Sequence, residues 1–167
     1  LSVGMPGKRE IMEVPLAKGV CEGDFKKMIS AALPKDLPCI AVRSVDDRHP
    51  APMASLTAAT YSVQFESLPD HFGDILARFM AQTEIPAIRK TKSGMKPCDI
   101  RPMIYECALE GNCLYMTLAL CEKATCKPDL FLSSLFEFAG IERPAALITR
   151  LQLLGGQAPN LMPLEML

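Results

Sequence analysis

Tryptophan is absent from the 167-residue sequence, and histidine is scarce, with only His49 and His71. Neither histidine has a Cys or Asp neighbour at the spacing of a metal-ligand set, and we expect His71 on a solvated helix face. The seven cysteines show neither the Cys-x-x-Cys spacing of zinc and redox sites nor the Cys spacing of an iron–sulfur cluster. We therefore predict no metal in this chain, and we interpret the cysteines as small core residues of a cytoplasmic protein.

Long hydrophobic runs and excess charge are also missing. The longest apolar runs, such as 113–121, are far shorter than the roughly 20 residues that a membrane span needs, and no secretory signal opens the chain. The formal net charge of -1 argues against a protein that coats nucleic acid with its whole surface, so any anion binding is expected to be local. A first residue Leu1 rather than Met fits a processed or excised piece of a longer product.

Catalytic motifs are missing too. Ser133 and Ser134 lie within a predicted helix and lack the Gly-x-Ser-x-Gly turn that exposes a nucleophile. The glycines form neither a phosphate-binding P-loop nor a dinucleotide fingerprint, and the carboxylates are scattered. We predict no catalytic residue, and an enzyme is the least favoured of the functional classes that stay open.

The first third of the chain has a strand–helix–strand pattern. Alternating apolar residues predict a strand over 8–16, and apolar residues three and four positions apart predict an amphipathic helix over 21–34. A run rich in β-branched residues predicts a second strand over 38–45. We interpret residues 1–46 as a partial unit, and the proline-rich, unpatterned residues 47–55 as a linker.

Residues 56–167 are predicted to form a second domain. The predicted strands cover 57–66, 86–91, 103–110, 113–121 and 146–154, and the predicted helices cover 67–82 and 128–139. Both helices carry large apolar residues at the same offsets from a Pro-Asp pair: Phe72, Leu76 and Phe79 in one, Phe131, Leu135 and Phe138 in the other. This repeat predicts an α+β fold, namely a ferredoxin-like split β-α-β sandwich with an antiparallel sheet and the helices on one face. The first unit would be a part of a similar fold.

The stretch IRKTKSGMKPCDIRP, residues 88–102, concentrates positive charge and is predicted to be a loop. Its five cations are Arg89, Lys90, Lys92, Lys96 and Arg101. Lys and Arg on a loop can neutralise phosphates, so these five are the candidate RNA- or anion-binding residues. The alternative is a solvated connection whose lysines keep an edge strand from pairing with another chain. Asp99 is predicted to be a structural turn or cap residue.

Five stretches carry a resemblance to a known family. They are EIMEVPL from Glu10, LTAATYSV from Leu56, CDIRP from Cys98, LITRLQLL from Leu147 and PLE from Pro163. In this order they resemble the radical SAM-linked family of bacterial proteins, which are encoded beside, or fused to, a radical S-adenosylmethionine protein. The family pattern includes a further N-terminal strand and helix, which agrees with a partial first unit.

The resemblance implies a cytoplasmic accessory domain whose partner is a radical SAM protein. The S-adenosylmethionine and the iron–sulfur cluster would belong to that partner, and this chain would hold no cofactor. Ahead of the enzyme, the least favoured class, two hypotheses stay open. The chain is either a non-catalytic module that contacts RNA (tRNA or rRNA) for the partner enzyme, or a protein–protein adaptor that docks the partner without nucleic acid. The oligomeric state does not follow from the sequence.

Overall fold

The computed structural model describes residues 4–17, 19–46, 48–91 and 94–166. The chain divides into two compact units, Met12–Ala51 on the one hand and Leu1–Ile11 with Pro52–Leu167 on the other. The structure is a mixture of helices and antiparallel strands, so the predicted α+β class is confirmed. The proposed domain limits, 1–46 and 56–167 with a linker over 47–55, stay a prediction; within that linker Pro52–Ser55 forms the short helix α2.

The unit Met12–Ala51 is organised around a single helix, α1 (Glu22–Ala32), which confirms the helix predicted over 21–34. Cys21 caps this helix, because its Sγ accepts a hydrogen bond from the backbone N of Asp24 at 3.4 Å. None of the residues of α1 is buried, and Met28 in its apolar stripe is largely exposed. The helix therefore forms from its local pattern and cap without a hydrophobic core beneath it.

The strands predicted over 8–16 and 38–45 are wrong. Neither range contains a strand among its described residues. A strand is stable when a neighbouring strand takes its N–H and C=O groups. In the second range the backbone meets a helix side chain instead, because Lys26 Nζ donates to Ile40 O at 2.9 Å. Alternation of apolar residues predicts an extended chain, but it does not supply a partner strand.

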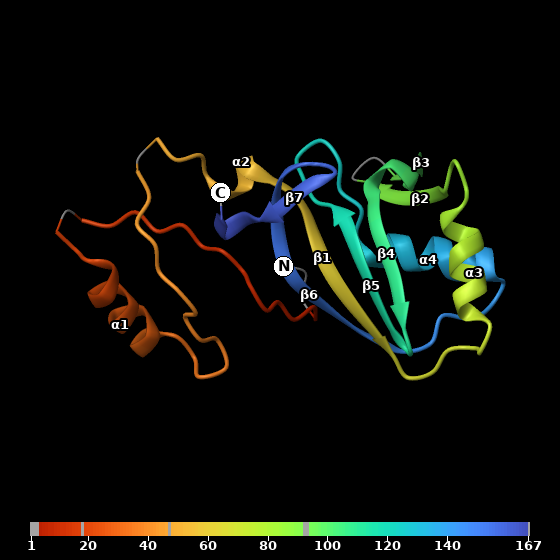
Figure 1. Cartoon of the computed structure of the whole chain (residues 1–167), viewed down its shortest axis with the longest axis horizontal. Coiled ribbons are helices and arrows are strands. Elements are labelled where there is room, and N and C mark those ends of the chain that lie inside the picture. The colour runs from red at the N-terminus through yellow and green to blue at the C-terminus, as the bar shows by residue number, and fades with distance from the viewer. Residues whose placement is uncertain (1–3, 18, 47, 92–93, 167) are drawn as a thin grey trace. The chain divides into compact units, whose positions relative to one another are not determined.

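The other unit is built on a curled five-stranded antiparallel sheet with the spatial order β4-β5-β1-β6-β7 (Figure 1). The strands are β1 (Leu56–Phe65), β4 (Ile104–Glu110), β5 (Cys113–Ala119), β6 (Ala146–Gln157) and β7 (Asn160–Pro163). β1, β4, β5 and β6 confirm predicted strands, whereas β7 lies outside the predicted ones. Gly7 adds a single parallel bridge to Arg150 at the edge of β6.

Local sequence explains the central strands. Along β1, Tyr61, Val63 and Phe65 are buried, and the residues between them are more exposed, as the alternation predicts. Gly111 has φ 58° and forms the tight turn between β4 and β5, a conformation that glycine adopts without a steric penalty.

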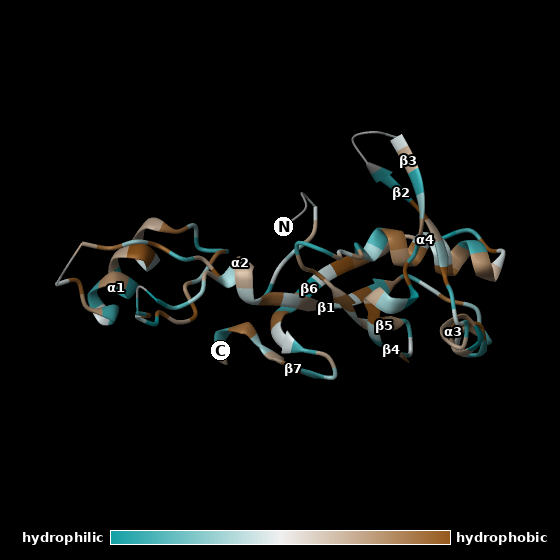
Figure 2. Ribbon diagram, turned by 90° about the horizontal axis from the view of Figure 1, so that it is seen from above, coloured by the Kyte–Doolittle hydropathy of each residue, from teal (hydrophilic) through white to brown (hydrophobic). Residues whose placement is uncertain are grey.

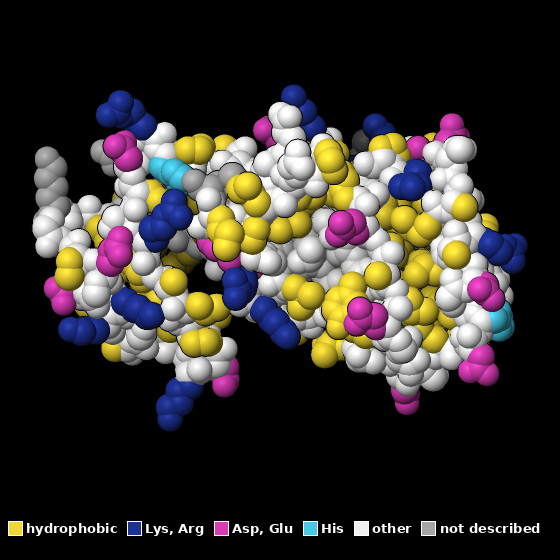
Figure 3. All heavy atoms as spheres, in the orientation of Figure 1, with side chains coloured by type: hydrophobic (Ala, Val, Ile, Leu, Met, Phe, Trp, Pro, Cys, Tyr) yellow, Lys and Arg dark blue, Asp and Glu magenta, His cyan; other side chains and the backbone are white. Residues whose placement is uncertain are grey.

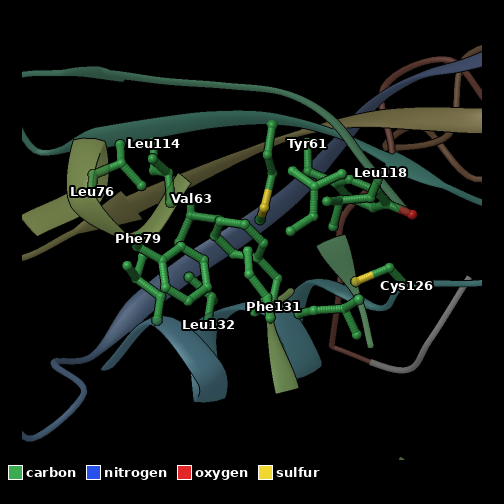
Figure 4. Packing of buried hydrophobic residues seen from close by; sticks show 14 of the residues in the cluster. Tyr61, Val63, Leu76, Phe79, Leu114, Leu118, Cys126, Phe131 and Leu132 are labelled. Carbon is green, nitrogen blue, oxygen red and sulfur yellow. The ribbon is translucent and has the colours of Figure 1, made fainter. Parts of the chain in front are cut away.

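Two helices, α3 (Phe72–Met80) and α4 (Pro128–Ala139), cover one face of the sheet (Figure 2). Their rings interlock beneath the sheet: Phe72 stacks on Phe136 at 5.4 Å between ring centroids, and Phe79 meets Phe131 edge-on at 5.6 Å. Figure 4 shows this core between the strands and the helices. None of the helices in the described part of the chain is long and apolar enough to cross a membrane.

Two details of the helices differ from the prediction. α3 begins at Phe72, and Pro69 lies in a turn before it whose carbonyl accepts a hydrogen bond from Phe72 N at 2.9 Å. Of the repeated apolar positions, Phe138 is exposed rather than buried, because it is the penultimate residue of α4; one side of its ring meets Phe79 at a tilted angle. The offset repeat therefore describes helix periodicity and does not by itself describe burial.

The strand predicted over 86–91 is confirmed, but the loop predicted for the rest of 88–102 is wrong over Gly94–Asp99, which is a strand. Residues Pro86–Thr91 (β2) and Gly94–Asp99 (β3) pair as a separate two-stranded antiparallel sheet, followed by a short 3-10 turn over Arg101–Met103. The hairpin projects from the layer formed by α4 and the main sheet (Figure 2). The positively charged composition of the stretch hid the second strand of the hairpin, because Lys and Arg have no strong preference for strands.

Candidate docking site on the β2–β3 hairpin

A network of hydrogen bonds holds the base of the hairpin. Asp99 Oδ1 accepts from the backbone N of Ile85 at 2.8 Å and from that of Arg101 at 2.9 Å. Ile100 N donates to Ile85 O at 2.9 Å, and Ser134 Oγ of α4 donates to Pro86 O at 3.3 Å. The carboxylate of Asp99 thus joins the two ends of the hairpin. α4 supports Pro86, the first residue of the hairpin, through Ser134.

The two arginines predicted to bind anions are attached to the protein's own backbone. Arg89 Nη2 donates to Thr125 O at 2.7 Å and lies 3.5 Å from Met103 Sδ. Arg101 Nε donates to Gln82 O at 3.2 Å. Both side chains are half-buried. Some of the guanidinium donors that would bind a phosphate therefore already have carbonyl partners.

The two lysines of known position lie on opposite faces of the hairpin. Lys96 faces Arg89 across the strand pair, whereas Lys90 faces Met95, and side chains alternate between faces along a strand. Both lysines are exposed. Lys92 lies outside the described residues. The structure therefore divides the predicted cluster into two tethered arginines and two exposed lysines that point in different directions.

The outer face of the hairpin exposes large apolar side chains that the charge of the stretch concealed. Ile88 is 62% exposed and Met95 is 65% exposed, and Pro97, which faces Ile88, is exposed as well. On the inner face, Ala87 is buried. The signal that could have revealed this face is an isolated Ile within a run of cations, two positions from Pro86 at the strand start.

The open face of the main sheet, opposite α3 and α4, carries acidic, polar and hydrophobic side chains. Glu106 and Glu110 of β4 face Thr117 and Cys113 of β5, and Tyr115 is the exposed aromatic of the central strands. Figure 3 shows this face, on which hydrophobic and acidic side chains lie over the strands. Its charge is unsuited to a phosphate backbone.

A second polar cluster ties the N-terminal segment to the edge of β6. Arg150 Nε donates to Glu10 Oε1 at 2.9 Å, its Nη2 donates to the other carboxylate oxygen, and its guanidinium also acts electrostatically on Tyr61, which faces it across the strand pair. Burial raises the pKa of Tyr61, and the hydrogen bond to Glu10 raises the pKa of Arg150. These groups satisfy one another, so the cluster is structural.

The cysteines have more than one environment. Cys126 is buried and supports the core interpretation, whereas Cys21 is exposed and caps α1. Burial raises the pKa of Cys107 and of Cys126 to about 12, so both stay protonated and unreactive near neutral pH. Among the residues whose positions are described, no three His, Cys, Asp or Glu side chains lie close enough together to hold a metal ion.

The fold and site define an α+β protein whose helices cover one face of an antiparallel sheet and whose extra hairpin presents an apolar, basic surface. The chain belongs to a family of uncharacterised proteins conserved in bacteria, DUF2344, whose model matches residues 1–128. The match therefore includes the hairpin, while β6 and β7 lie beyond it. No curated protein and no solved structure matches the chain.

Proposed function

We propose that the chain is a non-catalytic adaptor of the radical SAM-linked type, and that its β2–β3 hairpin docks a partner radical SAM protein in the cytoplasm. The partner would carry the S-adenosylmethionine and the iron–sulfur cluster. The observation that carries the proposal is the exposure of Ile88 and Met95 on a projecting hairpin whose base is fixed. Burying each such side chain against a partner contributes about 1.5–3 kcal/mol.

The proposal includes a ferredoxin-like scaffold for the adaptor. In support of it, β1, α3, β4, β5, α4 and β6 follow one another in the chain as β-α-β-β-α-β. The four strands lie in the spatial order β4-β5-β1-β6 with antiparallel neighbours, which suits a split β-α-β arrangement. The hairpin is then an insertion between α3 and β4, and β7 extends the sheet at its edge.

An RNA contact is the second candidate, because Lys90 and Lys96 are exposed. Two observations favour the adaptor over it. Arg89 and Arg101 donate to backbone carbonyls, and the open sheet face, where ferredoxin-like modules stack RNA bases, carries Glu106 and Glu110. The positive charge of the hairpin suits an acidic protein surface as well as it suits a phosphate.

The test is binding between the purified chain and the radical SAM protein encoded beside it, measured by calorimetry. The double variant Ile88→Asp and Met95→Asp should weaken binding about a hundredfold or more, because it removes two apolar contacts. The matched control, Lys90→Gln with Lys96→Gln, should weaken it only severalfold. Salt-sensitive binding of bulk RNA that the lysine variant abolishes, together with no binding to the partner protein, would instead establish the RNA function.

A further inference from the structure

The prolines of the hairpin determine which backbone groups point outward. In an antiparallel pair, facing residues alternate between pairs that exchange two hydrogen bonds and pairs that exchange none, whose N–H and C=O groups point away from the partner strand. Proline has no N–H and fits the second kind of pair. Both prolines assign the same set of facing pairs to the second kind. Pro86 faces Asp99, and Pro97 faces Ile88, which lies two positions further along β2.

This alternation defines the outer edge of β2. Ile88 and Lys90 direct both their N–H and their C=O groups away from β3. On the outer edge of β3, Met95 likewise offers an N–H donor, but Pro97 has no N–H to offer. No described residue forms a hydrogen bond with the outward backbone groups of Ile88 and Lys90. At Pro86 the edge is already occupied, because its carbonyl accepts from Ser134. The edge of β2 beyond Pro86 is therefore an open template for another strand.

The charge around this edge is positive. Arg89, Lys90 and Lys96 lie on the hairpin, and the sequence from 86 to 99 contains one acidic residue, Asp99. The carboxylate of Asp99 already accepts two backbone hydrogen bonds at the base. A strand that adds to this edge is therefore favoured when it is acidic.

We infer that the outer edge of β2 accepts an extended, acidic segment of the partner protein as an added β-strand. This inference rests on the proposed function and specifies how the partner is held. Backbone hydrogen bonds to Ile88 and Lys90 fix the segment, an apolar side chain covers Ile88, and an Asp or Glu two positions away pairs with Lys90. A second copy of the chain is disfavoured as the added strand, because it would bring Arg89 and Lys90 of both copies together.

The test uses the full chain as bait for a displayed library of random peptides about ten residues long, enough for one strand. Enriched peptides should contain an apolar residue and an acidic residue two positions apart. With the variant Lys90→Glu as bait, which changes an exposed side chain, a Lys or Arg should replace the acidic residue. An enriched peptide should also slow hydrogen exchange at the Ile88 and Lys90 amides about tenfold or more and leave Met95 unchanged.

Enriched peptides without an acidic preference, or protection at Met95 in place of Ile88 and Lys90, would overturn strand addition at β2. The proposed function is judged separately, by the partner protein itself. If Ile88→Asp with Met95→Asp abolishes partner binding while the partner leaves the Ile88 and Lys90 amides unprotected, the adaptor function holds and strand addition falls. If neither the partner protein nor any peptide binds, both the adaptor function and strand addition at β2 are refuted.

Discussion

Glu10 and Arg150 form a two-pronged ion pair, although 140 positions of sequence separate them. Arg150 also contacts Tyr61 in the centre of the sheet, so the pair attaches the N-terminal segment to β6 and β1. The Arg150 side chain is 12% exposed and that of Glu10 32%, which makes this pair better shielded from water than the other ion pairs of the described residues.

Replacing Glu10 with Gln should lower the free energy of unfolding by about 1–3 kcal/mol, because it leaves a shielded guanidinium without its counter-charge. The measurement is urea denaturation. Arg9→Gln is the matched control: it removes the neighbouring but exposed Arg9–Glu165 pair and should cost no more than about 1 kcal/mol. Equal losses in the free energy of unfolding for the two variants would show that the shielded Glu10–Arg150 pair stabilises the protein no more than the exposed pair does.

Replacing Asp99 with Ala should loosen the base of the β2–β3 hairpin. Two backbone donors, on Ile85 and Arg101, lose their acceptor, at a cost of about 1–3 kcal/mol. Hydrogen exchange of those two amides should speed up, while amides in the centre of β1 exchange as before. Asp99→Asn keeps an acceptor oxygen and should restore most of the protection; if it does not, the negative charge matters more than the hydrogen bonds.

Alkaline pH should destabilise the protein through its buried thiols. The pKa of Cys126 is raised to about 12 from the ordinary value of 9.0, so the unfolded chain releases this proton at a lower pH than the folded chain does. Stability from this group is complete below pH 9.0 and is lost as the pH rises toward 12, by at most about 4 kcal/mol. Cys126→Ala should make the free energy of unfolding fall less steeply with pH over that range. An unchanged slope would contradict a raised pKa of Cys126 as the cause.

Two glycine-to-alanine replacements should change the stability of the protein in opposite directions. Gly140 ends α4 in the left-handed region at φ 66°, so Gly140→Ala should cost about 1 kcal/mol. Gly73 lies inside α3, and a methyl group added there would point into open space, so Gly73→Ala should stabilise the protein by about 0.5–1 kcal/mol. Thermal unfolding of both variants, which differ from the parent by one methyl each, checks the pair.

Much of the main sheet and both of its covering helices could be predicted because their signals are local. Alternation along 57–66 and 103–121 places successive side chains on opposite faces of a strand, and this follows from strand geometry alone. The turn at Gly111 and the end of α4 at Gly140 likewise depend on the backbone freedom of one residue. The α+β class follows from these elements.

Other features could not be read from the sequence, because they depend on partners distant in the chain. The apolar alternation over 8–16 and the β-branched run over 38–45 both suit a strand, yet the described residues of neither range form one. Beyond the hydrogen bond from Lys8 N to Arg150 O, no strand ladder pairs with these described residues. Two of the candidate binding cations, Arg89 and Arg101, are tethered by carbonyls of Thr125 and Gln82.

Composition and periodicity by themselves determined the class of fold, the central strands, the helices and the concentration of charge at 88–102. Only the tertiary structure decided that this stretch is a hairpin, which of its cations reach water, and that Ile88 and Met95 share its exposed face. The physical reason is that a side chain's preference is local, whereas burial and hydrogen-bond partners are set by residues that folding brings from far along the chain.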